Sequence, residues 1–357
     1  MSRGAIARIN LSALRHNLTV ARQSAPQSKL IAAIKANGYG HGMVEVASAL
    51  TDADMFAVAC LSEAITLRES GIKKPILVLQ GFVNASELED FIRYHLTSVV
   101  HSEEQLMLLL KTELEGALSV WLKVDTGMHR LGLAPELVES AYLKLQAINN
   151  IQLQGVMTHF ACADEIDNKK TRQQTQRFLS SVENIDADFS MANSAAILAW
   201  PETHQQWIRP GIMLFGASPF VNGVARQHKL KPVMTFNAKL NAIKTIEAGE
   251  TVGYGASWTA DCSTRVGVVS VGYGDGYPRH AKTGTPVAVN GVKTQLLGRV
   301  SMDLITVDLA DIPARVGDVV ELWGGQISAD DVARCADTIA YELFTGITKR
   351  VEFTYLD

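Results

Sequence analysis

Eight short apolar runs, separated by segments with helical periodicity, recur between residues 30 and 209. They cover residues 30–34, 55–59, 76–79, 97–100, 118–124, 153–158, 188–192 and 207–209. The runs lack polar alternation, which is typical of strands that are covered on both faces. Eight strand–helix units of this kind predict an α/β fold, a (β/α)8 barrel whose chemistry lies at the carboxyl ends of its strands.

The pattern changes after residue 230, where strands follow one another without helices between them. Residues 234–246 form one such strand, and Asn290-Gly291 between two alternating runs predicts a hairpin. One helix is expected near residues 328–338, capped by Ser328. We therefore expect a strand within residues 1–10 that packs with the C-terminal part, a barrel over residues 11–228, and a mostly-β domain over residues 229–357.

Composition indicates which partners to expect. The 357 residues carry a net charge of -4, from 33 basic and 37 acidic residues mixed along the chain. This leaves no basic stripe for nucleic acid and no cationic patch for a membrane, so we expect a small-molecule substrate. The four cysteines lie far apart and form neither a metal-binding pair nor a disulfide framework, which fits the reducing cytosol. We recognise no signal peptide, membrane-spanning segment or metal motif.

Lys35 directly follows the first apolar run, and Asn37-Gly38-Tyr39-Gly40 comes after it. Asparagine and glycine accept positive φ, so a turn here places a tyrosine hydroxyl and backbone N–H groups beside the lysine amine. A lysine at a strand end more often simply meets solvent. However, KANGYGHG resembles the motif KANAYGHG of alanine racemases, with Gly38 in place of alanine. The resemblance implies that Lys35 binds pyridoxal 5'-phosphate through a Schiff base and that Tyr39 contacts the phosphate.

A second motif, VDTGMHRLG, follows the fifth apolar run and brings Lys123, Asp125, His129 and Arg130 to the expected mouth of the barrel. Such a loop also suits ordinary surface ion pairs. Arg130 nevertheless fits a carboxylate, because its planar guanidinium matches two oxygens and keeps its charge. The segment is similar to KxDTGMxRLG of alanine racemases. By that resemblance Arg130 binds the substrate carboxylate, and Lys123 is carbamylated so that its anionic end positions Arg130.

Three short motifs supply candidates at later strand ends. His159 in THF ends the sixth run, although a lone histidine is more often a core residue. Ser194 in NSAA begins a short helix whose free N–H groups favour an anion. Alternatively, Ser194 only caps this helix, and it can serve both roles at once. Gly211, after Arg209, lets the backbone at Gly211 and Ile212 approach a phosphate. By resemblance, His159 packs against the pyridine ring of the cofactor and Arg209 hydrogen-bonds the ring nitrogen.

The C-terminal part carries two glycine-rich turns with tyrosines, Tyr254 in TVGYGASW and Tyr273 in VSVGYGDGYPR. Such turns are often only hairpin ends, and neither matches the nucleotide-binding pattern GxGxxG in a strand-turn-helix setting. Both resemble segments of alanine racemases. The resemblance implies that Tyr254 is a second catalytic base, donated by the partner subunit of a homodimer with shared active sites, and that Tyr273 supports it.

Two more segments extend the resemblance, which runs from Ala5 to the C-terminus. GRVSMDL, residues 298–304, matches GRVxMD, with Ser301 where many relatives have cysteine. It implies that Met302, through its backbone N–H, and Asp303 complete the partner's substrate site. AYEL places Tyr341 on a helix, either as a half-buried aromatic residue or, by resemblance, as a contact to the cofactor phosphate.

Together these residues predict an enzyme with two bases. Racemisation removes the α-proton from one face of an amino acid and returns a proton to the other, which a base on each face achieves. Lys35 would serve one face and Tyr254 the other, provided that donors or cations such as His159 and Arg209 lower the tyrosine pKa. The family resemblance further implies a cytoplasmic enzyme that supplies D-alanine for peptidoglycan.

Two alternatives stay open. A racemase or decarboxylase of the same barrel type could act on another amino acid, but a decarboxylase needs a different residue opposite the lysine. A pyridoxal-phosphate carrier protein shares the lysine-bearing barrel without an added β domain, and the segment from residue 231 onward disfavours it. The sequence does not decide between alanine and larger substrates, or between a biosynthetic and a catabolic role.

Overall fold

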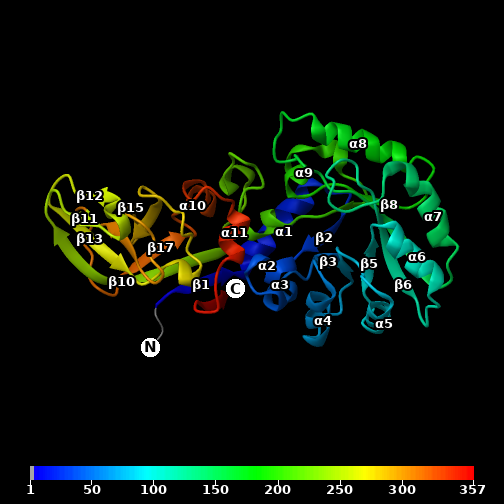
Figure 1. The fold of residues 1–357 in the computed structure, drawn as a ribbon, viewed down its shortest axis with the longest axis horizontal. Coiled ribbons are helices and arrows are strands. Elements are labelled where there is room, and N and C mark those ends of the chain that lie inside the picture. Colours follow the sequence, from blue (N-terminus) through cyan, green and yellow to red (C-terminus); the bar gives the residue numbers. More distant parts are fainter. Residues whose placement is uncertain (1–3) are drawn as a thin grey trace.

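The chain folds into two unlike parts that lie end to end (Figure 1). A computed structural model describes residues 4–357. Strands and helices alternate between residues 29 and 208 and close into a barrel, and residues from 234 onward form a mostly antiparallel sheet. The predicted (β/α)8 barrel followed by a β-rich domain is therefore confirmed.

The barrel strands pair in parallel in chain order, and the last strand returns to the first. They are β2 (Lys29–Ala33), β3 (Met55–Val58), β4 (Ile76–Val78), β5 (Thr97–Val100), β6 (Leu118–Lys123), β7 (Ile151–Met157), β8 (Asp188–Ser190) and β9 (Trp207–Ile208). Each matches one predicted run, although several end one or two residues earlier. Backbone pairing continues beyond these ends, since Arg209 N donates to Ala192 O at 2.9 Å.

Helices surround the barrel (Figure 1), namely α1 (Leu11–Ser24), α3 (Met43–Ala49), α4 (Leu61–Glu69), α5 (Ala85–Arg93), α6 (Glu103–Lys111), α7 (Val138–Gln146), α8 (Lys170–Ser181) and α9 (Ser194–Ala199). Side chains cap the starts of α1 and α6. Asn10 Oδ1 accepts from Ala13 N at 2.8 Å, and Ser102 Oγ accepts from Gln105 N at 3.2 Å. Gln105 Oε1 in turn accepts from His101 N, which makes a variant of the capping box.

The interior of the barrel is packed. Trp121 on β6 is fully buried in a cluster with side chains from other barrel strands, including Ile31, Leu77 and Met157. Gly155 on β7 makes room for it, because a Cβ there would lie 2.7 Å from the indole ring. Since the core is filled, a ligand has to bind above it, at the strand ends where the polar candidates lie.

The C-terminal sheet has the order β13 (Thr264–Val269), β16 (Ile305–Asp308), β15 (Val292–Leu297), β14 (Pro286–Val289), β17 (Val319–Trp323), β10 (Met234–Ile246), β1 (Ile6–Asn10) and β18 (Glu352–Leu356). β10 also pairs with β13, so the strands from β13 to β10 form a closed ring. Asn290 and Gly291 join β14 to β15 at positive φ, which confirms the predicted hairpin. The helices α10 (Ala329–Cys335), which follows Ser328, and α11 (Ala340–Thr345) precede β18.

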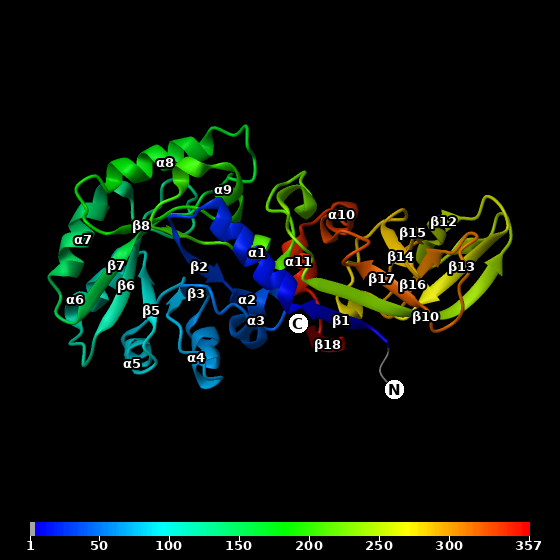
Figure 2. The ribbon, with the colours of Figure 1, turned by 180° about the vertical axis from the view of Figure 1, so that it is seen from behind.

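Strand β1 lies between β10 and β18, close to the point where the two parts meet (Figure 2). Ile6 pairs with Asn237 of β10 and with Glu352 of β18. The first and the last described strands therefore both lie in the C-terminal sheet, although α1 begins the barrel. Residues 1–3 of the predicted N-terminal segment lie outside the described residues. We propose the domain boundary near residue 229, just after the short turn η4 (Ala225–His228).

Candidate functional site

A cavity of about 1260 Å³ opens at the carboxyl ends of the barrel strands and extends towards α11. Its wall contains many residues that the sequence singles out: Lys35, Tyr39, Lys123, Arg130, His159, Ser194, Arg209, Gly211, Ile212 and Tyr341. The candidates from the C-terminal sheet, Tyr254, Tyr273, Met302 and Asp303, do not line it. A single chain therefore brings the barrel candidates together in the cavity, whereas the candidates of the C-terminal sheet lie outside it.

Lys35 begins a single left-handed turn, α2 (Lys35–Tyr39). Ala36, Asn37 and Tyr39 have φ angles of 52°, 55° and 50°. A non-glycine residue in this conformation costs about 1–2 kcal/mol, so the surrounding structure has to hold the turn. The sequence predicts positive φ at Asn37 and Gly38. It does not predict this conformation at Ala36, because alanine rarely adopts it.

The turn packs tightly against its neighbours. Gly40 has to be glycine, because its φ is 78° and a Cβ would lie 2.1 Å from Phe344 O in α11. Tyr39 stacks on Phe215 with 4.8 Å between ring centroids, and its ring centroid lies 5.9 Å from that of Tyr341. The two predicted phosphate-contact tyrosines thus lie side by side.

Two lysine amines lie in the cavity among other cations. Burial lowers the pKa of Lys35 and the charge of Arg130 lowers it further, while Glu63 acts in the opposite direction. Burial also lowers the pKa of Lys123 to about 8, helped by neighbouring cations, first among them Arg209. A larger fraction of each amine is therefore neutral at pH 7 than for an exposed lysine. A neutral amine is the form that accepts a proton or attacks a carbonyl group.

The loop that carries Arg130 is folded around Asp125. Asp125 Oδ1 accepts hydrogen bonds from the backbone N–H groups of residues 127–129, at 2.9, 3.0 and 3.0 Å. His129 Nδ1 lies 3.2 Å from Asp125 Oδ2. Asp125 and His129 therefore make the ordinary loop contacts that the sequence leaves open, whereas Arg130 and Lys123 line the cavity.

His159 and Arg209 contact each other, with His159 Nδ1 at 3.5 Å from Arg209 Nη2. The buried guanidinium of Arg209 also donates to Ser190 Oγ at 2.6 Å and to Thr158 O. Burial and the charge of Arg209 hold the pKa of His159 well below its usual value, so the ring is neutral near pH 7. Burial lowers the pKa of Arg209 to about 10, which leaves the guanidinium charged.

Gln174 holds the loops that follow β6 and β7, and no sequence motif marks it. This fully buried side chain on α8 donates to Thr126 Oγ1 and His159 O, at 3.1 and 3.0 Å, and accepts from Ala161 N at 2.9 Å. Thr126 hydrogen-bonds Thr158 at 2.8 Å. A glutamine on a helix usually faces solvent, so only the structure reveals this contact.

Ser194 belongs to the cavity and is not the helix cap. Asn193 caps α9, since its Oδ1 accepts from Ala196 N at 3.1 Å, and the cap alternative for Ser194 is therefore wrong. Ser194 Oγ instead accepts from Gly211 N at 2.8 Å. A Cβ on Gly211 would lie 2.5 Å from the Tyr39 hydroxyl, so only glycine fits between these groups.

The candidates from the C-terminal sheet lie on its outer surface. Tyr254 is 70% exposed, in a short turn between β11 (Thr251–Val252) and β12 (Trp258–Thr259). These strands lie at the end of the molecule that is remote from the barrel (Figure 1). Tyr273 and Met302 are 39% and 52% exposed. Asp303 pairs with Arg350 at 2.6 Å.

The three segments that carry these candidates contact one another. Gly274 N donates to Met302 O at 2.9 Å, which joins the Tyr273 turn to the GRVSMDL segment. Gly298 packs against the strand before Tyr254, where a Cβ would lie 2.9 Å from Val252 O. We call the resulting surface the donor face; it consists of Tyr254, Tyr273, Met302 and Asp303.

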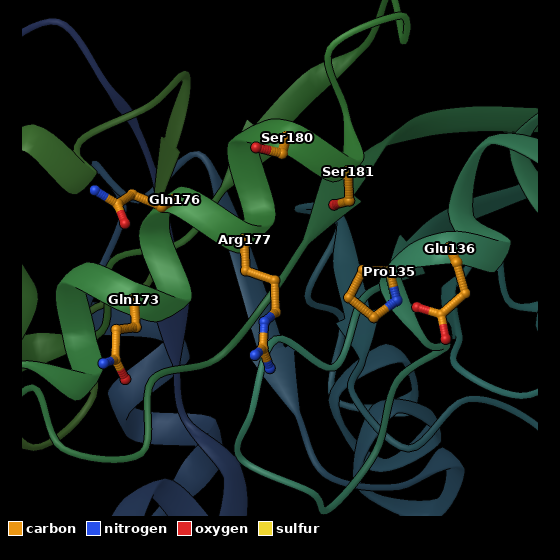
Figure 3. A pocket seen from close by; sticks show the side chains of 7 residues that line it. All are labelled: Pro135, Glu136, Gln173, Gln176, Arg177, Ser180 and Ser181. Atoms are coloured by element: carbon orange, nitrogen blue, oxygen red, sulfur yellow. The ribbon is translucent and has the colours of Figure 1, made fainter.

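A more open hollow of about 780 Å³ lies on the outside of the barrel (Figure 3). Side chains from α8 and from the 3-10 turn η1 (Pro135–Leu137) line it. Arg177 lies between them and donates to Thr126 O at 3.4 Å. None of the sequence-predicted site residues lines this hollow, so it is separate from the candidate site.

Comparison with known proteins agrees with the motifs. The family model described as "Alanine racemase, N-terminal domain" matches residues 9–219, and "Alanine racemase, C-terminal domain" matches residues 233–355. The alanine racemase of Vibrio cholerae is 48% identical over 355 residues, which cover 99% of this chain and 98% of that protein. The chain belongs to the alanine racemase family.

Solved structures of alanine racemases have the same fold. The biosynthetic alanine racemase from Pseudomonas aeruginosa matches with a TM-score of 0.96 and 45% identity, over 100% of both chains. The alanine racemase from Acinetobacter baumannii matches with a TM-score of 0.93 and 39% identity, over 99% of both chains. Both parts of the fold therefore occur together in the family.

The alanine racemase family uses pyridoxal phosphate, and the cavity fits such an anion. Lys35, Lys123 and Arg209 give its wall a positive charge, while the missing Cβ of Gly211 lets the hydroxyls of Tyr39 and Ser194 converge. Within residues 4–357, no group of His, Cys, Asp and Glu is arranged to hold a metal ion. Among the described helices, none has the length and apolar character needed to cross a membrane.

Proposed function

We propose that the chain is a pyridoxal-phosphate-dependent alanine racemase that interconverts L-alanine and D-alanine. The observation that carries the proposal is the cavity that brings together Lys35, Arg130 and Arg209. Lys35 supplies an amine whose pKa burial lowers, and Arg130 supplies a planar fork for the carboxylate of an amino acid. Membership of the alanine racemase family supports alanine as the substrate.

The cofactor would be anchored by Lys35 at the end of β2. When bound, pyridoxal phosphate withdraws electrons from the α-carbon of the amino acid and so makes its proton acidic. Tyr39, Ser194 and Tyr341 provide hydroxyls for the phosphate. The remaining contacts that we assign to the cofactor come from His159, Arg209, Gly211 and Ile212.

The proton chemistry requires one base on each face of the α-carbon. We assign one face to Lys35, because its amine is partly neutral and lies in the cavity. We assign the other face to Tyr254, which a partner subunit would supply. Arg130 orients the substrate carboxylate. A carbamate on Lys123, whose pKa of about 8 leaves part of the amine neutral and reactive, would hold Arg130 by charge.

The proposed partner is a second copy of the chain. Tyr254 is 70% exposed, and its turn lies between β11 and β12 at the far end of the C-terminal part, whereas α2 lies near the middle of the molecule, where the two parts meet (Figure 1). In a twofold dimer each contact occurs twice, so the donor face of one subunit covers the cavity of the other at both sites. Exposed aromatic and methionine side chains suit such an interface. The isolated subunit should therefore be inactive.

We place the enzyme in the cytoplasm, where it would supply D-alanine for peptidoglycan. Cys60, Cys162, Cys262 and Cys335 are all unpaired, which fits a reducing compartment. The role in cell-wall synthesis rests on the family.

Polarimetry of L-alanine with the purified chain and pyridoxal phosphate tests the proposal. We expect loss of optical rotation with L-alanine, and slower loss or none with L-serine and L-lysine. Faster loss with serine or lysine would assign the enzyme to another amino acid. No loss with any of the three would contradict the racemase proposal.

A further inference from the structure

Glu63 links the turn that carries Lys35 to the neighbouring strand. Its Oε1 accepts a hydrogen bond from Ala36 N, and its Oε2 accepts one from Ala59 N, both at 2.7 Å. Ala36 directly follows Lys35, and Ala59 directly follows β3. One carboxylate on the first turn of α4 therefore joins the segments that follow two adjacent barrel strands, β2 and β3.

The left-handed turn needs such an anchor. Within the turn, Gly38 N donates to Ile34 O at 2.8 Å and Gly40 N donates to Ala36 O at 2.9 Å. The N–H of Ala36 instead points out of the turn, to Glu63. Because the turn contains non-glycine residues at unfavourable φ, an external contact has to stabilise it, and a charged acceptor makes the stronger hydrogen bond.

Comparison with α5 separates the two contacts of Glu63. Glu63 is the third residue of α4, and Glu87 is the third residue of α5. Glu87 Oε2 accepts from Val83 N at 2.8 Å, which matches the contact to Ala59. Among the described residues, the contact to Ala36 has no counterpart at Glu87. This second contact therefore does more than begin a helix.

The charge of Glu63 also acts on the lysine amine. Arg130 and Lys123 bring positive charge to the amine from the end of β6 and its loop, and the neutral His159 approaches after β7. Burial and Arg130 lower the pKa of Lys35, whereas the carboxylate of Glu63 raises it.

We propose that Glu63 is a positioning residue for Lys35: its carboxylate holds Ala36 in the left-handed turn, directs the lysine amine into the cavity and places a negative charge beside the residue that follows the lysine. The inference deepens the proposed function and rests on it for the use of that amine. Glu63 itself does not line the cavity.

Glu63→Gln tests the inference. Glutamine has no charge, and its single carbonyl oxygen can accept only one of the two backbone N–H groups. Its NH2 group then faces the other N–H and cannot accept from it. The full-length chain, freed of cofactor, is treated with trace acetic anhydride at a series of pH values, and acetylation of Lys35 is followed by mass spectrometry. We expect the midpoint of acetylation to move to lower pH. The dissociation constant of pyridoxal phosphate should rise about tenfold, for the loss of one charge-assisted hydrogen bond.

Glu87→Gln is the matched control, since it loses the same kind of contact at the start of α5. It should change neither the acetylation midpoint nor the affinity for pyridoxal phosphate. Glu63→Asp keeps the charge but is too short to span both N–H groups, so it should weaken cofactor binding and leave the midpoint near that of the unmodified chain.

An unchanged midpoint in Glu63→Gln, or an equal shift in Glu87→Gln, would overturn the inference. If Glu63→Gln does not fold, unchanged cofactor affinity in Glu63→Asp overturns it instead. Racemisation is measured separately. An unmodified chain that binds the cofactor but racemises no amino acid would contradict the proposed function and leave the acetylation result valid.

Discussion

The cavity and the donor face differ in the burial of their candidate residues. In the cavity, Lys123 and Arg209 are 9% and 7% exposed, and burial lowers the pKa of both. On the donor face, Tyr254 and Met302 are 70% and 52% exposed. Burial within one chain therefore shifts the pKa values of the barrel residues. The donor-face residues stay exposed in that chain, and a second molecule would have to bury them. The difference is consistent with the proposed site shared between two subunits.

Removing the amine on the barrel side should have the largest effect. We expect Lys35→Ala to lower the racemisation rate by more than about 1000-fold, since it removes both the cofactor anchor and one base. Polarimetry and cofactor absorbance measure the two losses. Lys29→Ala, at the other end of β2, is the control and should stay active. Activity that survives in Lys35→Ala would show that the cavity is not the catalytic site.

Removing the donor-face phenol should have the next largest effect. We expect Tyr254→Phe to slow racemisation by about 100-fold or more, because one face loses its base. Proton exchange from one enantiomer should fall more than exchange from the other, as deuterium uptake from solvent would show. Equal loss for both enantiomers would rule out separate bases.

Mixing the two variants tests whether the site is shared. In a dimer of Lys35→Ala and Tyr254→Phe subunits, one site has both defects and the other has neither. Random reassociation should therefore restore about a quarter of the unmodified activity. The control is each variant reassociated alone. A mixture no more active than its parts would place Tyr254 and Lys35 in the same subunit or in no common site.

Gln174→Met should have a smaller effect that is confined to the barrel side. It breaks a buried hydrogen-bond network, and we expect it to lower the free energy of unfolding by about 2–4 kcal/mol. Racemisation should fall about tenfold because the backbone of His159 loses a partner. Urea unfolding and polarimetry measure these effects, with the exposed neighbour Gln173→Met as control. Loss of dimerisation in Gln174→Met would contradict the separation of the two regions.

The last prediction concerns the stability contributed by Lys123 in carbonate-free buffer, where its amine is unmodified. Its folded pKa of about 8 lies below the ordinary value of 10.5, so the unfolded chain binds more protons between these values. Relative to Lys123→Met, the free energy of unfolding should therefore rise with pH from about 8 to 10.5. Denaturant titrations at several pH values check this, with a substitution of the exposed Lys144 as reference. A difference that falls over this range would contradict burial of the amine.

Much of the barrel side could be predicted from the sequence. Apolar runs without alternation define strands, and their ends fix where Lys35 and Arg209 lie. The hairpin at Asn290-Gly291 could also be predicted, because few residue pairs tolerate positive φ at both positions of a two-residue hairpin turn. Local patterns of this kind report on the backbone within a few residues.

Contacts between distant segments could not be predicted in this way. Gln174 and Glu63 are polar residues on helices, and nothing in their immediate sequence separates them from solvent-facing neighbours. Ala36 adopts left-handed φ although alanine disfavours it, because packing overrides local preference. Asn193 caps α9 and leaves Ser194 for the cavity, which the motif left open because asparagine and serine are both favoured N-cap residues.

The pairing of Ile6 with Glu352 has a consequence for how the protein is made. During translation the barrel strands leave the ribosome before β18 is synthesised, so β1 has to wait for its second neighbour until the chain is released. Loss of the last few residues would leave β1 at an open sheet edge, where foreign strands can add. Because β1 and β18 pair in parallel, Ile6 lies beside Glu352 and Leu356 lies beside Asn10, so a circular permutant needs a linker that runs the length of both strands.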